Sequence, residues 1–220
     1  MRMRKKKHLE ERIAACGDLL IADPRTHAGA WRAYFSERTE TDASEKSLAL
    51  EIGCGKGAFI LEMARREPEV LFIAVEMCRE ALLLAMEKAK EAELKNVVFL
   101  CENAADLKEM FAFEEVDRIY LNFSDPWPKS KHAKRRLTAP SFLEIYAYLL
   151  KKDGFLRQKT DNVILFASSL ENYRALGWRL SDLTDDLHAS PQNADNVETE
   201  YEKNFSAKGF TIHAVTARKK

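Results

Sequence analysis

Residues 117–129 read Asp-Arg-Ile-Tyr-Leu-Asn-Phe-Ser-Asp-Pro-Trp-Pro-Lys. The apolar, β-rich run at 117–121 predicts a central strand. Pro126 and Pro128 then stop it, because each proline fixes its own φ and restricts the residue before it. The result is a stiff loop at the carboxyl end of a strand, where open α/β folds bind ligands. This loop presents the carboxylate of Asp125 beside the large aromatic ring of Trp127.

A dense basic run, Lys-Ser-Lys-His-Ala-Lys-Arg-Arg, follows at residues 129–136. Clustered lysines and arginines bind phosphates. An acid and an aromatic at a strand end, followed by such a cluster, indicate chemistry on a nucleic-acid base. The alternative is a polar turn with a solvated basic face. Trp127 and His132 could stack on a base, and Trp127 could equally anchor the loop to the core.

The bulk composition bounds the class of protein. A chain of 220 residues that is 46% hydrophobic suits one domain plus an arm. We find neither an apolar run long enough to span a membrane nor the apolar stretch of a signal peptide. The few cysteines are typical of the reducing cytoplasm. They form no Cys-x-x-Cys pair, and the spacing of His188 and His213 is not that of metal ligands. We therefore predict no metal site.

Charge is distributed unevenly along a chain whose formal net charge is zero. Residues 1–7 and 129–136 hold ten of the 35 lysines and arginines and no acid. Such segments are typical of local phosphate sites, although exposed basic tails also occur without a specific partner. Residues 181–202 carry seven acids and neither Lys nor Arg. One hypothesis is that this acidic segment holds residues 1–7 when RNA is absent.

Strand and helix patterns alternate from residue 47 onward, which predicts an α/β fold with a doubly wound, mostly parallel sheet. Two further strands are expected in residues 178–220, around a long polar insertion, giving seven in all. Residues 1–45 read as an N-terminal basic arm and linker, anchored by Trp31, Tyr34 and Phe35, and residues 46–220 as the main domain. The other predicted strands are 47–52, 70–75, 97–101, 118–121 and 154–159, and the predicted helices are 58–66, 79–92, 106–111, 140–151 and 162–176.

A glycine-rich loop, Glu-Ile-Gly-Cys-Gly-Lys-Gly at residues 51–57, joins the first main-domain strand to its helix. Glycines let a backbone approach a ligand closely. The spacing also satisfies the fingerprint of a dinucleotide-binding loop. Glu76 lies where an acid would bind the cofactor ribose, whether the cofactor is a dinucleotide or S-adenosylmethionine. Glu51 favours S-adenosylmethionine, because its carboxylate attracts a cationic cofactor and repels a pyrophosphate.

Two function classes other than an S-adenosylmethionine-dependent enzyme remain open. An NAD-dependent oxidoreductase would explain the glycines but not the basic run. A non-catalytic RNA-binding module on a decayed methyltransferase fold would keep the basic segments but lose the acids of the pocket, and these are present.

Several motifs resemble known families. Glu51-x-Gly53-x-Gly55-x-Gly57 with Glu76 resembles class I S-adenosylmethionine-dependent methyltransferases, which are Rossmann-like. The segments that look like the bacterial tRNA (guanine-N7-)-methyltransferase family are 122–129, 131–137, Lys159-Thr160-Asp161-Asn162 and Thr199-Glu200-Tyr201-Glu202. This second resemblance spans nearly the whole chain.

The resemblance implies methyl transfer from S-adenosylmethionine to N7 of a guanosine in the tRNA variable loop, with Asp125 as the catalytic position. It also implies a cytoplasmic monomer or homodimer with no membrane and no obligate heterologous subunit. It assigns Glu51, Gly53, Gly55, Glu76, Asn103 and Asp125 to the cofactor, Lys129, Asp161, Thr199, Glu200, Tyr201 and Glu202 to the substrate, and Lys131, His132, Lys134, Arg135 and Arg136 to RNA contact.

This sequence departs from the family pattern in two places. Many relatives have Asp at the position of Asn103, where an amide can still bond the adenine edge. The strand before Lys159 holds Arg157 and Gln158 instead of apolar residues, so this strand is expected to pack differently from that of the relatives.

The reaction itself makes modest demands on side chains. Guanine N7 carries a lone pair and no proton, so its attack on the methyl group needs no general base. Positioning should therefore dominate. Asp125 would stabilise the cationic product base, while Asp161 and Glu202 could accept hydrogen bonds from the guanine Watson–Crick edge. The alternatives are a helix N-cap for Asp161 and a polar surface loop for residues 199–202.

Overall fold

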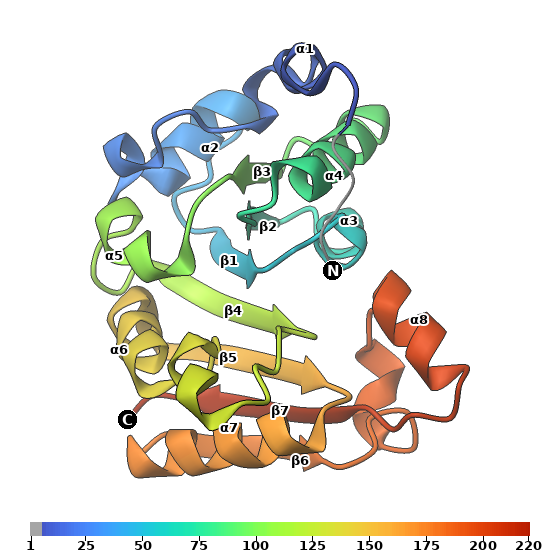
Figure 1. Cartoon of the computed structure of the whole chain (residues 1–220). Helices are drawn as coiled ribbons and strands as arrows, with labels where there is room; N and C mark the ends of the chain where they lie inside the picture. Colours follow the sequence, from blue (N-terminus) through green and yellow to red (C-terminus); the bar gives the residue numbers. More distant parts are fainter. Residues whose placement is uncertain (1–5) are drawn as a thin grey trace. The chain divides into compact units, whose positions relative to one another are not determined.

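The computed structural model describes residues 6–220, and the chain divides into two compact units, residues 1–112 and 113–220. Figure 1 shows both units as strands flanked by helices. Most of the N-terminal basic run, residues 1–5, lies outside the described residues. The proposed contact of that run with the acidic segment therefore stays a hypothesis.

Unit 1 is built on three parallel strands, β1 (Ser47–Ile52), β2 (Val70–Val75) and β3 (Val97–Leu100), in the order β3-β2-β1. Every residue of β2 is buried, as its continuous apolar sequence predicts for a parallel strand covered on both faces. Helix α3 (Ala58–Arg66) follows β1, α4 (Arg79–Glu91) follows β2, and the short α5 (Leu107–Met110) follows β3. Such crossovers are what parallel pairing requires.

The segment before β1 is more regular than its sequence indicates. It contains α1 (Leu9–Ala15), the 3-10 turns η1 (Gly17–Leu19) and η2 (Pro24–His27), and α2 (Trp31–Thr39). Trp31 and Phe35 are fully buried, as expected for anchors, and the Trp31 indole donates to the Met110 carbonyl at 2.8 Å. These two side chains are one turn apart, which is too short a pattern to reveal the helix. The boundary at residue 45 stays a prediction.

Unit 2 holds four strands in the order β4-β5-β7-β6: β4 (Val116–Asn122), β5 (Leu150–Thr160), β6 (Arg179–Thr184) and β7 (His213–Arg218). β4 and β5 are parallel, and β7 runs antiparallel to both of its neighbours. Helix α6 (Pro140–Leu149) connects β4 to β5, and α7 (Val163–Ala175) connects β5 to β6.

The predicted fold class, an α/β fold with seven mostly parallel strands, is confirmed for residues 6–220. β5 begins four residues earlier than predicted, directly after α6. The polar residue Gln158 within β5 is buried, and its amide group donates to Ser169 Oγ at 3.0 Å and accepts from the Tyr173 hydroxyl at 3.1 Å. These bonds satisfy the buried amide, so this departure from the family pattern is accommodated.

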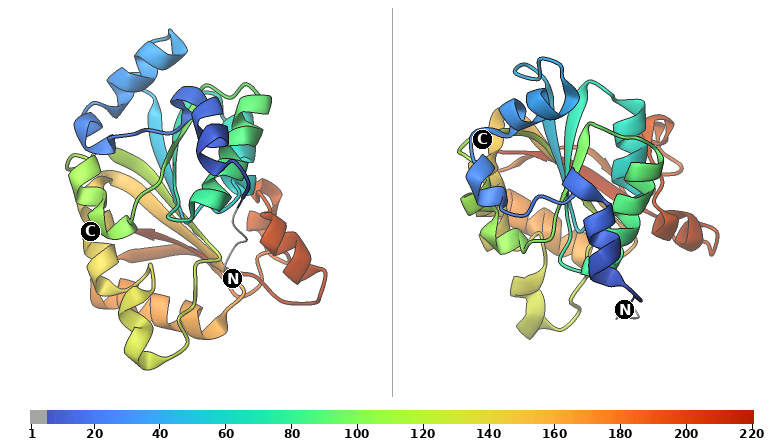
Figure 2. Two further views of the ribbon diagram at one scale, coloured as in Figure 1. Left: turned by 45° about the horizontal axis from the view of Figure 1, so that its top comes forward. Right: turned by 90° about the horizontal axis from the view of Figure 1, so that it is seen from above.

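The polar insertion between β6 and β7 contains the turn η5 (Pro191–Asp195) and a helix, α8 (Glu200–Ser206). Figure 1 and Figure 2 show α8 beyond the carboxyl ends of β4 and β5. The sequence carried a sign of this helix, because Thr199-x-x-Glu202 is the capping-box pattern. None of the helices within residues 6–220 is both long enough and apolar enough to cross a membrane.

Candidate active site

The loop after β1 exposes backbone at two of its three glycines. Gly53 and Gly55 have φ of +79° and +54°, and a Cβ built at either would meet nothing within 4 Å. Gly57 has φ of +77°, and a Cβ there would lie only 2.7 Å from the Cβ of Ala85 in α4. The first two glycines therefore leave open space for a ligand beside the backbone, and the third lets the loop pack against α4.

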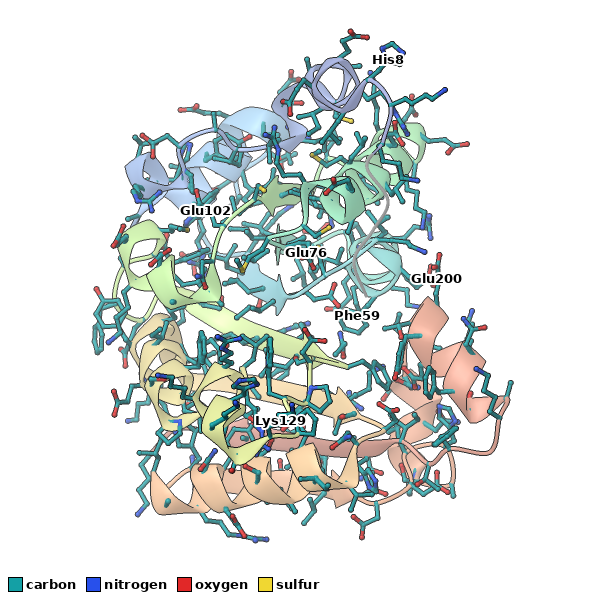
Figure 3. All side chains as sticks on the ribbon, viewed as in Figure 1. His8, Phe59, Glu76, Glu102, Lys129 and Glu200 are labelled. Atoms are coloured by element: carbon teal, nitrogen blue, oxygen red, sulfur yellow. The ribbon has the colours of Figure 1, made fainter. Side chains whose placement is uncertain are left out.

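Two carboxylates act on this loop. Glu76, labelled in Figure 3, follows β2 and accepts hydrogen bonds from the backbone of Gly55 at 3.1 Å and of Cys78 at 2.8 Å. Glu51 lies buried in β1. Burial raises the pKa of the Cys54 thiol well above its usual range, and the charges of Glu51 and Glu76 raise it further. The loop therefore sits in a negative field that favours a cationic ligand over a pyrophosphate.

Asn103 completes the candidate cofactor residues of unit 1. It lies in the loop after β3, is exposed, and accepts a hydrogen bond from the Ala105 backbone at 3.0 Å. This bond caps the turn η3 (Ala104–Asp106) and orients the side-chain oxygen toward the backbone. The NH2 group of the same amide can then donate to a ligand such as an adenine ring.

The Asp125 loop in unit 2 turns sharply at both ends. Phe123 and Trp127 have φ of +52° and +40°, which large side chains rarely adopt. Each such residue costs on the order of 1–3 kcal/mol and persists only because surrounding contacts enforce it. The Phe123 amide donates to the Lys159 carbonyl at 2.9 Å, which ties the loop to the end of β5. Asp125 lies exposed between the two turns.

The basic run forms the turn η4 (Ser130–Arg135), whose side chains lie on the surface of unit 2. His132 meets the Trp127 ring edge-on at 5.7 Å, and the Arg135 guanidinium lies 5.0 Å from the centre of the same ring. Trp127 thus packs within its own loop segment. The exposed basic side chains are Lys129, Lys131, Lys134 and Arg135.

Arg136 does not share this exposed basic face. It is 7% exposed and donates to the Pro126 carbonyl at 3.0 Å, the Trp127 carbonyl at 3.2 Å and Ser168 Oγ at 2.8 Å. The prediction that it contacts RNA stays a prediction, and such a contact would require its guanidinium to break these internal bonds. Its sequence position beside Arg135 could not reveal the difference.

Asp161 lies at the carboxyl end of β5. The N-cap of α7 is its neighbour Asn162, which accepts from the Leu165 backbone at 2.8 Å, so the N-cap alternative for Asp161 is wrong. Asp161 instead accepts from the Tyr201 hydroxyl at 3.2 Å. Burial and the charge of Asp161 raise the pKa of Tyr201 to about 12, so the phenol remains a donor at neutral pH.

Tyr201 is also part of an aromatic row in unit 2. Its ring stacks on Phe205 with centroids 4.0 Å apart and lies 5.0 Å from Phe123 of the Asp125 loop. Glu200, labelled in Figure 3 with Lys129, lies at the exposed start of α8.

Glu202 is fully buried, unlike its neighbours in α8. Its carboxylate accepts from Lys159 Nζ at 2.7 Å and Asn196 Nδ2 at 2.7 Å, lies 2.9 Å from His188 Nε2, and closes a capping box with Thr199. Both oxygens are engaged within the protein, and direct contact with a guanine edge would require breaking these bonds. Thr199 and Glu202 therefore shape the segment that presents Tyr201.

Comparisons with known proteins show which family this chain belongs to. A family model described as "Putative methyltransferase" matches residues 45–215. The tRNA (guanine-N(7)-)-methyltransferase of Geobacillus kaustophilus is 46% identical over 217 residues, covering 99% of this chain and 96% of that protein. The protein of the same name from Limosilactobacillus reuteri is 44% identical over 99% of both chains. The chain belongs to the tRNA (guanine-N(7)-)-methyltransferase family. This membership excludes the NAD-dependent oxidoreductase alternative.

The fold is similar to that of two solved methyltransferase structures. The 16S rRNA methyltransferase KamB is 20% identical with a TM-score of 0.62, covering 86% of this chain and 94% of that one. An S-adenosylmethionine-dependent methyltransferase from Aquifex aeolicus is 16% identical with a TM-score of 0.56, covering 96% and 98%. At these identities the likeness concerns the fold alone.

Sequence reasoning missed two residues that hold the candidate site together. Lys159 was expected only as a flank of Asp161, yet it is 2% exposed and bonds Glu202, Asn196 and the Val197 carbonyl. Ser168 was not singled out, although it bonds Arg136. Neither residue left a signal in the sequence, whereas the capping-box pattern at Thr199 and Glu202 was readable.

Proposed function

We propose that this protein transfers a methyl group from S-adenosylmethionine to N7 of a guanosine in the variable loop of tRNA. Curated relatives that carry this family name are 41–46% identical along essentially the whole chain. The single observation that carries the proposal is the Asp125 loop. It sets an exposed carboxylate at the carboxyl end of β4, directly before an exposed basic turn.

The residues of unit 1 fit a cationic cofactor. Gly53 and Gly55 offer open backbone, and Glu76 is held by two backbone amides yet can accept further hydrogen bonds from ribose hydroxyls. The negative field of Glu51 and Glu76 suits an amine and a sulfonium. S-adenosylmethionine supplies the electrophilic methyl group, and the residues of unit 1 proposed to hold it are Glu51, Gly53, Gly55, Glu76 and Asn103.

Asp125 acts by charge and orientation in this proposal. Guanine N7 has a free lone pair, so no side chain has to remove a proton before methyl transfer. The base becomes cationic as the new bond forms, and a carboxylate close to the ring stabilises that charge. Alignment of the base with the methyl group can contribute on the order of 7 kcal/mol or more.

The substrate residues divide by exposure. Asp161, oriented by Tyr201, accepts hydrogen bonds from N–H groups of the guanine edge. Lys129 and Glu200 are exposed, whereas Thr199 and Glu202 support α8. Lys131, His132, Lys134 and Arg135 contact the RNA from η4. Phosphate contacts of this kind position the RNA but do not identify the base.

The substrate partner is tRNA, the protein acts in the cytoplasm and away from membranes, and it functions as a monomer or homodimer without another subunit or a metal ion.

The test is incubation of the protein with unmodified tRNA and methyl-labelled S-adenosylmethionine, followed by digestion to nucleosides. We expect label in 7-methylguanosine and a loss of at least a hundredfold in rate for Asp125→Asn, since the amide keeps the shape but not the charge. Arg174→Ala, an exposed change on α7, is the control. Label in any other nucleoside would overturn the proposed substrate atom.

A further inference from the structure

The guanidinium of Arg136 occupies a buried position directly behind the Asp125 loop. Nε donates to the Pro126 carbonyl at 3.0 Å and Nη2 donates to the Trp127 carbonyl at 3.2 Å. These two carbonyls belong to the two residues that follow Asp125 in the chain. One rigid planar fork therefore holds two successive peptide groups, a geometry that a lysine ammonium cannot reproduce.

The loop needs such a restraint. Trp127 is held at φ of +40°, and unusual conformations of this kind persist only where surrounding contacts enforce them. Pro126 has no N–H group to contribute to a local hydrogen bond. The carbonyl bonds to Arg136 are thus the polar contacts that fix the backbone immediately after Asp125.

The third bond of Arg136 reaches another element. Nη1 donates to Ser168 Oγ at 2.8 Å, and Ser168 lies in α7. Helix α7 begins at Val163, two residues after Asp161, and its N-cap is Asn162. One side chain therefore links the loop of Asp125 to the helix that starts beside Asp161.

We propose that Arg136 is a positioning residue that sets the Asp125 loop against α7, and that it is not one of the phosphate contacts of the basic run. The inference rests on the proposed function for its kinetic consequence, but not for the structural one. Releasing Arg136 to bind a phosphate would leave two carbonyls without their donors, so the two roles exclude each other.

The variants are Arg136→Ala, Arg136→Lys and Ser168→Ala, compared with Arg135→Ala and the exposed control Arg174→Ala. Loss of loop geometry should lower kcat of Arg136→Ala by about tenfold to a hundredfold, because misplacement of about 1 Å can cost about that much. Its KM for tRNA and the salt dependence of binding should stay within twofold of wild type. Arg136→Lys should recover part of kcat, and Ser168→Ala should lose a few-fold.

Arg135→Ala should show the opposite pattern in binding. Loss of one phosphate contact should flatten the dependence of log affinity on log salt by about 0.7–0.9. If Arg136→Ala flattens the salt dependence to this extent while kcat is retained, Arg136 is a phosphate contact and the proposal is overturned.

A measurement without tRNA separates this inference from the proposed function. Exchange of the backbone amide hydrogens of residues 123–125 and 127 should be faster in Arg136→Ala and Ser168→Ala than in wild type and Arg174→Ala. Ser168→Ala removes one bond and keeps the guanidinium, so it tests the proposal even if Arg136→Ala fails to fold. Unchanged exchange in both variants would overturn the positioning role. If the wild-type protein makes no 7-methylguanosine, the proposed function is wrong, and the positioning role of Arg136 is not affected.

Discussion

Lys159 Nζ and Glu202 Oε2 lie 2.7 Å apart, with side chains 2% and 0% exposed. Lys159 stands near the end of β5, two residues before Asp161, and Glu202 lies in α8. This buried pair fastens α8 to the strand end and thereby holds Tyr201 against Asp161. Buried charges are maintained only when paired and hydrogen-bonded, as both are here.

Breaking this pair should destabilise the protein strongly. Lys159→Met leaves the Glu202 carboxylate buried without its cation and should lower the free energy of unfolding by about 3–5 kcal/mol. The control is Lys151→Met, which removes a more exposed lysine 3.0 Å from Asp117 and should cost less than about 1 kcal/mol. Urea unfolding measures both, and equal effects would contradict the interpretation.

The same pair predicts a loss of stability in acid. Burial raises the pKa of Glu202, but the charge and hydrogen bond of Lys159 outweigh it, and the folded pKa is lowered below the ordinary value of 4.5. A lowered folded pKa gives stability that is present above 4.5 and lost as the pH falls through the folded value. Unfolding free energies measured from pH 7 down to pH 3 should fall more steeply for wild type than for Glu202→Gln. Parallel curves for the two proteins would show that Glu202 does not contribute to acid unfolding.

Gly57→Ala should damage the cofactor loop from within. The new methyl group would lie 2.7 Å from the Ala85 Cβ at φ of +77°. Backbone strain of about 1–2 kcal/mol adds to overpacking of about 1–3 kcal/mol. Gly17→Ala, with positive φ but nothing within 4 Å, should cost only the strain. Thermal unfolding and calorimetry with S-adenosylmethionine provide the readouts. If Ala85→Gly restores nothing in the double variant, the clash is not the cause.

Tyr201→Phe should separate the aromatic contact from the hydrogen bond. The phenylalanine ring keeps the stack on Phe205 but cannot donate to Asp161. We expect turnover to fall a few-fold and stability to change by about 0.5–1.5 kcal/mol, the range for one hydrogen bond. Phe113→Leu, at an exposed ring in unit 2, is the matched control. The measurement is the single-turnover rate with tRNA. A wild-type rate for Tyr201→Phe would show that Asp161 needs no orienting partner.

The exposed basic face should carry most of the salt dependence of tRNA binding. Replacing Lys131, Lys134 and Arg135 together by Ala should flatten the slope of log affinity against log salt by about 0.7–0.9 per lost contact. A charge-matched triple, Lys95→Ala, Lys152→Ala and Arg174→Ala, removes three exposed cations elsewhere. Equal slopes for the two triples would mean that the RNA reaches the protein by another surface.

Much of the fold could be predicted because local patterns agree with the final packing. The bounds of β1, β2 and α3 match the prediction, since their apolar runs end at Gly53, Glu76 and Pro68. The Asp125 loop was also readable, because prolines restrict the backbone wherever they occur. Helix α8 was missed although its capping box was legible, because seven mostly polar residues carry little periodicity.

The order of the amino acids is enough to show which strand ends carry carboxylates, which loop carries glycines, and where basic residues cluster. Which of these side chains are buried depends on how distant segments pack together. Arg135 and Arg136 are adjacent and chemically identical, yet one lies over Trp127 at the surface and the other bonds three groups inside. Glu200 and Glu202 differ in the same way. The physical reason is that the free energy of a charged group depends on its hydrogen-bond partners and on its exposure to water. Segments far apart in the chain provide the partners and the burial.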